Sequence, residues 1–323
     1  MGLGSPGSRW VWALVLTTAC RGEAESATTT TTTRASDTSL ASPDPLTPLD
    51  EVVVDADEVV EVQGSKMVLD PDDRIVSRVI RRDKIWEPLE TDLFSRALEP
   101  GDVVIDVGAN IGYYTLLAAR RVGPTGHVYA FEPEPRAFAI LQRNVALNGY
   151  TNVTLVAKAL GRSPGTLRLY LAKRNRGDHR VYDPTGKREA IDVEVVTLDE
   201  VLAAEPPARI DLIKIDTQGA ECSILAGAEQ TLADHREATI LMEFTPNALV
   251  AVGDSPRGCL ERLTGSGFAL FDVDEWQREV SPTDVETLLR EYPEDDPKRF
   301  TNLLLPARSG TADGAEVPSA VPP

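Results

Sequence analysis

The sequence predicts an α/β fold in which strands alternate with helices, and three observations lead to this prediction. The apolar run at residues 103–107 ends in a glycine turn, which is followed by a helical pattern. The next apolar run, residues 127–131, ends in Glu132. A third apolar run, residues 208–215, ends in Asp216 and a second glycine turn. Because ligands of open α/β sheets bind outside the carboxyl ends of the strands, these three ends predict the binding site.

The turn after the first strand carries Gly108 and Gly112, and Asp106 stands two residues before the first glycine. We expect the glycines to let a ligand approach the backbone, because a Cβ atom would occupy the space that the ligand needs. The spacing differs from the Gly-x-Gly-x-x-Gly of dinucleotide sites, and Asp106 would repel a pyrophosphate. A ligand with an ammonium group and no phosphate, such as S-adenosylmethionine, suits this turn. A purely structural turn is the alternative.

Glu132 ends the second strand, roughly 25 residues after Asp106, a separation at which an acid can accept hydrogen bonds from a ribose diol. We therefore predict two acids on neighbouring strand ends. A solvated carboxylate without a ligand is the alternative interpretation of Glu132.

Length, composition and charge limit the classes of protein to consider. A chain of 323 residues with 42% hydrophobic residues can form one large domain or two small ones. Its formal net charge of −18 argues against nucleic acid or an anionic membrane as the main partner, because both require a basic surface. Cys20, Cys222, Cys259 and the three histidines show no metal-ligand spacing, so we expect neither a disulfide framework nor structural zinc.

Residues 1–50 differ from the rest of the chain. Residues 10–20 form an apolar stretch that is too short to span a bilayer, and the Thr-, Ser- and Pro-rich segment after it is predicted to be a disordered linker. The stretch is either an export or lipoprotein-like signal or an extension without function. Because a protein that needs a cytosolic cosubstrate should not be exported, we favour the second interpretation and a cytoplasmic location.

Residues 51–100 are predicted to form a small β/α extension, residues 101–306 the main domain, and residues 307–323 a disordered tail. After the second strand we expect, in order, a helix at 135–148, strands at 152–157, 166–171 and 191–196, a helix at 198–202, strands at 208–215 and 238–242, a helix at 256–264, and strands at 267–271 and 301–305. The acidic segment 274–300 is predicted to be a helical insertion or a lid over the substrate.

A polar loop at residues 175–183 lies between two predicted strands and carries groups able to hold a substrate, including Asp178 and Arg180. His179 in this loop is a candidate base, because an imidazole titrates near neutrality. An exposed histidine paired with Asp178 or Asp183 is the alternative.

Lys214 stands within an apolar strand, where a lysine is costly to bury unless a carboxylate meets it. Glu221 and Glu243 are the candidate partners. Glu243 follows the next apolar strand, so it should reach the same edge of the sheet as Asp216.

Four ordered blocks occur together in the chain: Trp-Glu-Pro at 86–88, Gly-Asp-Val-Val-Ile-Asp-Val-Gly-Ala-Asn-Ile-Gly-Tyr-Tyr-Thr at 101–115, Phe-Glu-Pro-Glu-Pro at 131–135, and Ile-Asp-Leu-Ile-Lys-Ile-Asp-Thr-Gln-Gly-Ala-Glu at 210–221. Over approximately residues 51–306 the chain resembles the FkbM family of S-adenosylmethionine-dependent methyltransferases. The resemblance implies a seven-stranded, mostly parallel, Rossmann-like class I methyltransferase fold. It also implies O-methylation of a sugar or natural-product hydroxyl.

The resemblance further implies roles for individual residues. It places Asp106, Gly108, Asn110 and Gly112 around the methionine part of S-adenosylmethionine, Tyr113 and Tyr114 at the entrance, Glu132 at the ribose, and Ala159 and Leu160 beside the adenine. Asp216 would face the methyl donor and the acceptor. The family usually has Glu at position 218, whereas Gln218 can only hydrogen-bond the acceptor. The base would then be Asp216, Glu243 or His179.

The predicted activity is methyl transfer by direct displacement, in which the protein aligns the acceptor oxygen, excludes water and takes up a proton. The expected partner is a small-molecule acceptor, without nucleic acid or stable membrane insertion, and a homodimer is left open. Other interpretations are an N-methyltransferase, a non-catalytic S-adenosylmethionine-binding relative, and a nicotinamide-dependent oxidoreductase. The acids could also hold a divalent metal, although no compact ligand cluster is visible in the sequence.

Overall fold

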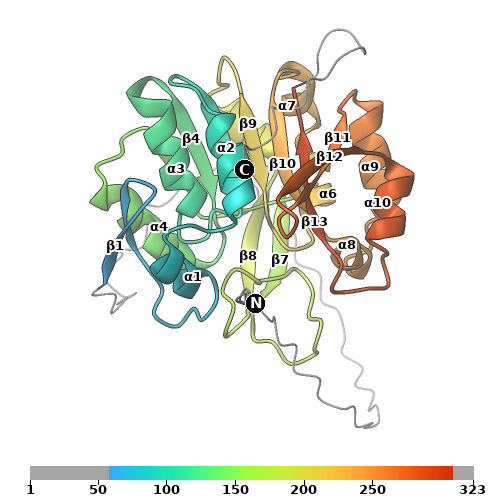
Figure 1. Cartoon of the computed structure of the whole chain (residues 1–323), viewed down its shortest axis with the longest axis horizontal. Helices are drawn as coiled ribbons and strands as arrows, with labels where there is room; N and C mark the ends of the chain where they lie inside the picture. The colour runs from blue at the N-terminus through green and yellow to red at the C-terminus, as the bar shows by residue number, and fades with distance from the viewer. Residues whose placement is uncertain (1–57, 308–323) are drawn as a thin grey trace, which may run out of the picture. The chain divides into compact units, whose positions relative to one another are not determined.

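Eight strands form the central sheet of the computed structural model, which describes residues 58–307 (Figure 1). Their order across the sheet is β12-β11-β13-β10-β9-β3-β4-β5, and the strands from β10 to β5 in this order run parallel. The strands are β3 (Val103–Val107), β4 (His127–Phe131), β5 (Val153–Val156), β9 (Leu212–Ile215), β10 (Thr239–Phe244), β11 (Leu270–Asp274), β12 (Glu279–Thr283) and β13 (Thr301–Leu305).

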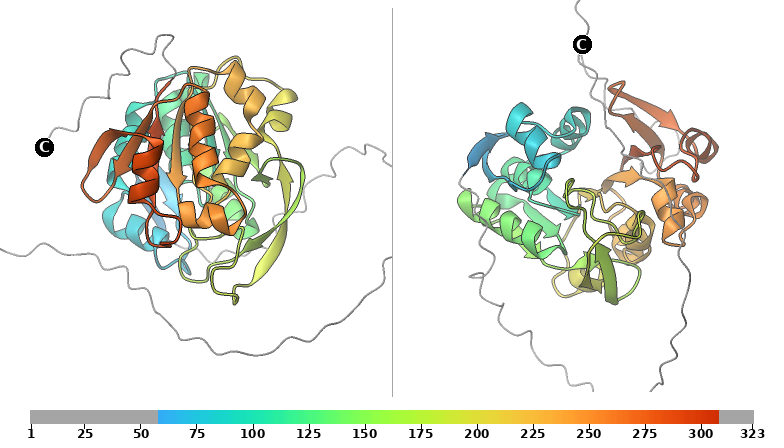
Figure 2. Two further views of the ribbon diagram at one scale, coloured as in Figure 1. Left: turned by 90° about the vertical axis from the view of Figure 1, so that its right-hand side faces the viewer. Right: turned by 90° about the horizontal axis from the view of Figure 1, so that it is seen from below.

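Helices cover both faces of this sheet (Figure 2). One face carries α1 (Val76–Asp83), α2 (Pro88–Arg96), α3 (Tyr113–Val122) and α4 (Pro135–Leu147). The other face carries α5 (Leu198–Ala203), α6 (Glu221–Ala226), α7 (Glu229–Asp234), α8 (Pro246–Ala251), α9 (Pro256–Gly265) and α10 (Val285–Glu291). Val104 of β3 belongs to the first hydrophobic core and Ile105 to the second, because successive side chains of a strand point to opposite faces. This explains why the parallel strands consist mainly of apolar residues.

The predicted α/β fold is confirmed, but the central sheet has eight strands rather than seven. The additional strand is β12, which pairs antiparallel with β11 at the edge of the sheet. Its sequence, Glu-Val-Ser-Pro-Thr, contains no apolar run, and none of its residues is fully buried. Pro282 cannot donate to a strand ladder, which restricts it to an edge position of this kind. The segment 274–300 therefore contains β12 and α10 rather than a purely helical insertion.

A three-stranded sheet and a hairpin lie beside the main sheet. The small sheet has the order β6-β8-β7, with β6 (Ala159–Leu160), β7 (Gly165–Tyr170) and β8 (Ala190–Val196), and β1 (Val59–Val62) pairs with β2 (Ser65–Val68) in the hairpin. Residues 171–189 connect β7 to β8 and include the predicted polar loop, residues 175–183. The backbone N–H of Arg74 donates to the carbonyl of Arg174 at 2.9 Å, so this loop is attached to the segment that precedes α1.

A disulfide bond joins Cys222 of α6 to Cys259 of α9, with the two Cα atoms 5.6 Å apart. The expectation of no disulfide is therefore wrong for this pair. The two cysteines are 37 residues apart in the sequence, and only the packing of α6 and α9 in one hydrophobic core brings them together. Such proximity cannot be read from cysteine spacing.

Residues 1–57 and 308–323 are outside the described part of the chain. The predicted apolar segment, the linker and nearly all of the predicted tail lie there, as does the start of the predicted N-terminal extension. Among residues 58–307, none of the helices is both long enough and apolar enough to cross a membrane.

Candidate active site

A pocket lies where β3, β4 and β9 end at the same edge of the sheet. Eight of the residues predicted for the site line it, namely Gly108, Asn110, Glu132, Ala159, Leu160, His179, Asp216 and Gln218. The lining also includes apolar and loop residues that were not predicted: Val107, Phe131, Pro133, Ala137, Lys158, Leu167, Leu169, Arg176, Gly177, Val181 and Thr217. The other predicted residues lie outside this lining, namely Asp106, Gly112, Tyr113, Tyr114, Asp178, Arg180 and Glu243.

The two glycines of the first turn have left-handed backbones, with φ of +84° at Gly108 and +96° at Gly112. Protein atoms fill the space beside both. A Cβ atom on Gly108 would lie 1.9 Å from the carbonyl oxygen of Asp216, and one on Gly112 would lie 2.6 Å from Cδ1 of Leu141. The expectation that these positions make room for a ligand is therefore wrong. The glycines instead let β3 approach the end of β9 and let α3 approach α4.

The carboxylate of Glu132 is held by two backbone donors. Oε2 accepts from the N–H of Asn110 and Oε1 from the N–H of Glu134, both at 2.8 Å. Burial raises the pKa of Glu132 to about 8, and the two hydrogen bonds act in the opposite direction. Because a carboxylate oxygen can accept two hydrogen bonds, each oxygen retains a lone pair for a ligand in the pocket. Asn110, with φ of +50°, shapes the turn so that its N–H points at Glu132.

Asp106 lies under the turn and is almost completely buried. Its Oδ2 accepts a hydrogen bond from Oγ1 of Thr115 at 2.6 Å, which ties the end of β3 to α3. Burial raises the pKa of Asp106, although the charge of Lys214 opposes this effect. Asp106 therefore supports the turn through its bond to α3 and is not part of the pocket wall.

The aromatic pair at the start of α3 lies in the hydrophobic core rather than at the entrance of the pocket. The hydroxyl of Tyr113 is 3.1 Å from Oγ1 of Thr91, and the ring of Tyr114 packs against Phe94 with centroids 4.9 Å apart. Burial raises the pKa of both tyrosine hydroxyls. The structure thus gives both residues packing positions between α2 and α3.

Lys214 is buried, as expected, but its partners differ from those predicted. Its Nζ atom is 3.2 Å from Oε1 of Glu90 and 3.3 Å from Oδ2 of Asp216. Burial lowers the pKa of Lys214, but these carboxylates outweigh burial and raise the pKa above its ordinary value. Glu221 accepts instead from backbone N–H groups of its own turn, and Glu243 accepts from Gln218. The correct partner Glu90 lies in α2, far from Lys214 in the sequence.

Gln218 links the acids at the ends of β9 and β10. Its Nε2 donates to Oε1 of Glu243 at 2.9 Å and lies 3.3 Å from Oδ1 of Asp216. Arg180 of the polar loop donates to Oε1 of Gln218 at 3.4 Å. Oε2 of Glu243 is buried and has no hydrogen-bond partner in the described part of the chain. Burial, followed by the charges of Asp216 and Glu221, raises the pKa of Glu243 well above its ordinary value.

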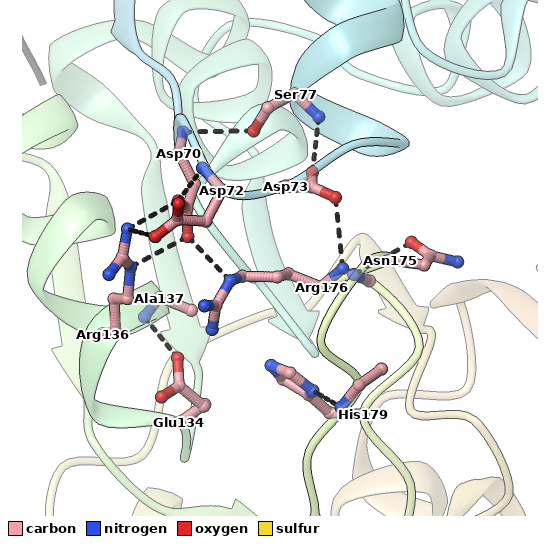
Figure 3. Close-up of polar contacts among 12 residues, drawn as sticks. Asp70, Asp72, Asp73, Ser77, Glu134, Arg136, Ala137, Asn175, Arg176 and His179 are labelled. Atoms are coloured by element: carbon pink, nitrogen blue, oxygen red, sulfur yellow. Dashed lines mark hydrogen bonds and ion pairs between the residues drawn. The ribbon is translucent and has the colours of Figure 1, made fainter.

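Arg176 attaches the polar loop to the segment that precedes α1, as Figure 3 shows. Nε of Arg176 is 3.2 Å from Oδ2 of Asp70, and the N–H of Arg176 donates to Oδ1 of Asp73 at 3.2 Å. His179 lies on the pocket side of the same loop, and its Nδ1 accepts from the N–H of Ala172 at 3.0 Å (Figure 3).

The predicted alternative partners of His179 bind elsewhere. Asp178 accepts from Arg180 and Arg188, both at 2.5 Å, and Asp183 accepts from the backbone of Thr185. Asp178 and Arg180 thus form part of the loop itself, and Arg180 connects that loop to Gln218.

Glu87 is a charged residue near the site that sequence reasoning missed. It has a left-handed backbone, with φ of 40°, although it precedes a proline, which normally forces an extended conformation. Burial and the charges of Glu90 and Asp216 raise the pKa of Glu87 well above its ordinary value. The sequence feature that could have identified Glu87 is its position in the Trp-Glu-Pro block at residues 86–88.

Comparison with known protein families decides the identity of the fold. The methyltransferase FkbM domain matches residues 106–291, which is more than half of the chain. The chain belongs to the FkbM methyltransferase family. The pocket residues fit S-adenosylmethionine. The pocket offers two carboxylate lone pairs on Glu132 for a diol, an apolar wall at Ala159 and Leu160, and a buried nitrogen of His179 that has no hydrogen-bond partner among the described residues.

Two curated relatives of this FkbM methyltransferase illustrate the similarity. The chain is 32% identical over 157 residues to methyltransferase sdnD of Sordaria araneosa, covering 39% of this chain and 60% of that protein. It is 34% identical over 162 residues to the 31-O-demethyl-FK506 methyltransferase FkbM of Streptomyces tacrolimicus, covering 41% of this chain and 61% of that protein. The matches thus span about 60% of the length of these relatives.

A solved structure with a similar arrangement is TYW2 of M. jannaschii in complex with AdoMet. The identity is 15% and the TM-score 0.39, with 77% of this chain and 84% of that chain covered.

Among the described residues of the FkbM methyltransferase, His, Cys, Asp and Glu form no group of three or more that could hold a metal ion.

Proposed function

We propose that this chain transfers the methyl group of S-adenosylmethionine to a hydroxyl oxygen of a small-molecule acceptor, such as a sugar or a natural product. The observation that carries this proposal is the pair of carboxylates at the ends of β9 and β10. Gln218 holds Oε1 of Glu243 at 2.9 Å, while Oε2 of Glu243 is buried and has no partner. A hydroxyl is a poor nucleophile, so the reaction benefits from a positioned group that takes its proton.

Glu243 is the base that the contacts favour. Its pKa is raised by burial and by neighbouring acids, which makes its ionised form a stronger proton acceptor than an exposed carboxylate. Asp216 lines the pocket beside it, and its negative charge complements the positive sulfonium of the cosubstrate. When bound, S-adenosylmethionine supplies a methyl group that the sulfonium already activates for direct displacement. The protein therefore has to align the acceptor, exclude water and receive one proton.

The remaining pocket residues are assigned to cosubstrate binding. Glu132 accepts hydrogen bonds from the ribose hydroxyls through its two free lone pairs. Ala159 and Leu160 pack against the adenine, and the turn at Gly108 and Asn110 surrounds the methionine part. Glu132 and Gly108 directly follow β4 and β3, two of the strands whose ends meet at the pocket.

Oxygen is favoured over nitrogen as the acceptor atom by one relative. The Streptomyces tacrolimicus relative is a 31-O-demethyl-FK506 methyltransferase, a name that describes methylation at an oxygen. The acidic surroundings of Glu243 and Asp216 also disfavour an anionic acceptor, because a second negative charge would be repelled. A neutral, polyhydroxylated acceptor satisfies both points.

The test is methyl transfer from labelled S-adenosylmethionine to matched pairs of acceptors that differ in a hydroxyl or an amine at one position. We expect label on the hydroxyl member, and loss of most turnover in Glu243→Gln with unchanged binding of S-adenosylhomocysteine. Glu279→Gln, which alters an exposed carboxylate on the edge strand β12, is the matched control. Binding of S-adenosylhomocysteine with label on amines alone would contradict the oxygen assignment.

A further inference from the structure

His179 has two ring nitrogens in different environments. Nδ1 accepts a hydrogen bond from the backbone N–H of Ala172 at 3.0 Å. A backbone N–H can only donate, so Nδ1 carries no proton in this arrangement. The neutral ring must then carry its proton on Nε2.

The environment of the ring keeps it neutral. Burial lowers the pKa of His179, and the charges of Arg176 and Arg188 act in the same direction, while Glu134 and Asp178 oppose them. A neutral ring with an unprotonated Nδ1 is a hydrogen-bond donor at Nε2. Nε2 could accept a proton only after losing its own, and the ring would then carry no proton on either nitrogen. The role of base that the sequence suggested is therefore incompatible with this geometry.

The Nε2 atom is buried and has no hydrogen-bond partner among residues 58–307. His179 lines the pocket together with Glu132 and Gly177. A buried donor left without an acceptor is destabilising, and an acceptor atom of a ligand in the pocket would remove that cost.

The loop that carries His179 is held in place independently of any ligand. Arg176 is attached through its side chain to Asp70 and through its backbone to Asp73, three residues before the histidine (Figure 3). The N–H of Ala172 fixes the rotation of the ring itself. The donor is thus positioned before the ligand arrives, which lowers the entropic cost of using it.

We propose that the Nε2–H of His179 donates a hydrogen bond to an acceptor atom of bound S-adenosylmethionine, so that His179 is a cosubstrate-binding residue rather than the catalytic base. The inference rests on the proposed function, since it uses the same pocket. It adds a hydrogen bond from the β7–β8 loop to the contacts proposed for Glu132, Ala159 and Leu160.

Two substitutions separate the two ring nitrogens. In His179→Asn the side-chain oxygen can replace Nδ1 as the acceptor for Ala172, but nothing reaches the position of Nε2. In His179→Gln the side-chain amide reaches the position of Nε2 and can donate there. Calorimetric titration of the full chain with S-adenosylhomocysteine should show a roughly tenfold weaker affinity for the Asn variant and recovery of most of it in the Gln variant. His235→Asn, at a histidine outside the pocket lining, is the matched control.

The outcomes distinguish this inference from the proposed function. If the unmodified protein binds S-adenosylhomocysteine and the Asn variant binds it equally well, the inference is overturned alone. A Gln variant weaker than the Asn variant would also overturn it, because loop anchoring would then explain the loss. If the unmodified protein does not bind, the proposed function and the inference fall together.

A nitrogen NMR spectrum gives a second readout that needs no turnover. The imidazole of His179 should show a protonated Nε2 and an unprotonated Nδ1, and its Nε2–H signal should shift when S-adenosylhomocysteine is added. A proton on Nδ1 in the ligand-free protein would overturn the inference.

Discussion

Glu132 should make cosubstrate affinity depend on pH, and this dependence can be calculated from the structure. Burial holds the pKa of Glu132 at about 8 in the ligand-free protein, with the charges of Glu134 and Asp106 acting in the same direction. A ribose that donates two hydrogen bonds to this group binds the ionised form. Binding at lower pH must therefore first remove a proton from the carboxyl group.

The size of the effect follows from the pKa. With a pKa of about 8, ionising Glu132 costs about 2.7 kcal/mol at pH 6 and about 0.4 kcal/mol at pH 8. The affinity for S-adenosylhomocysteine should thus rise roughly fiftyfold between pH 6 and pH 8, and the rise should stop above about pH 8. The affinity rises with pH because Glu132 of the free protein holds a proton that is released when the ligand binds.

The assay is calorimetry at several pH values in buffers with different enthalpies of ionisation, which reports the number of protons released. Nearly one proton should be released per ligand at pH 6 and fewer at pH 8. In Glu132→Gln the affinity should be lower at pH 8 and independent of pH, because the amide does not titrate. An affinity of the unmodified protein that is the same at pH 6 and pH 8 would refute this reasoning.

Three further perturbations test the site and its support. Asp216→Asn should lower turnover more than the affinity for S-adenosylhomocysteine, and unchanged turnover would remove Asp216 from the site. Lys214→Met should lower the free energy of unfolding in urea by about 3–5 kcal/mol, because Glu90 is left buried without its cation, and adding Glu90→Gln should restore part of the loss. Gly108→Ala should lower the melting temperature sharply or prevent folding, because its Cβ atom would meet the carbonyl oxygen of Asp216; an unchanged melting temperature would contradict this.

The strands that build the site could be predicted because each carries a strong local signal. β3 and β4 occupy the predicted residues, since their apolar side chains are buried on both faces of a parallel sheet. β12 could not be predicted from its sequence, because an exposed edge strand that contains a proline has neither an apolar run nor clear alternation. Strands whose side chains are buried on both faces were thus predicted correctly, whereas the exposed edge strand was missed.

The contacts between distant segments could not be predicted. Lys214 signals that it needs an anion, but several carboxylates satisfy that condition in the sequence, and only the packing of α2 on the sheet selects Glu90. The glycine at 108 was predicted correctly as a necessary position and for the wrong reason. Its neighbour is the carbonyl oxygen of Asp216, more than a hundred residues later, rather than a ligand.

Gln218 was the strongest sequence argument for a non-catalytic relative, because the FkbM family resemblance implies a glutamate there. The contacts favour a different conclusion. Gln218 donates to Glu243 and lies close to Asp216, while its oxygen accepts from Arg180. A glutamate in the same place could accept from Arg180 but could not donate to either acid, and it would add a negative charge beside Glu243, whose pKa is already raised. An amide at position 218 therefore suits these contacts better than a glutamate would, and the role of base is proposed for Glu243.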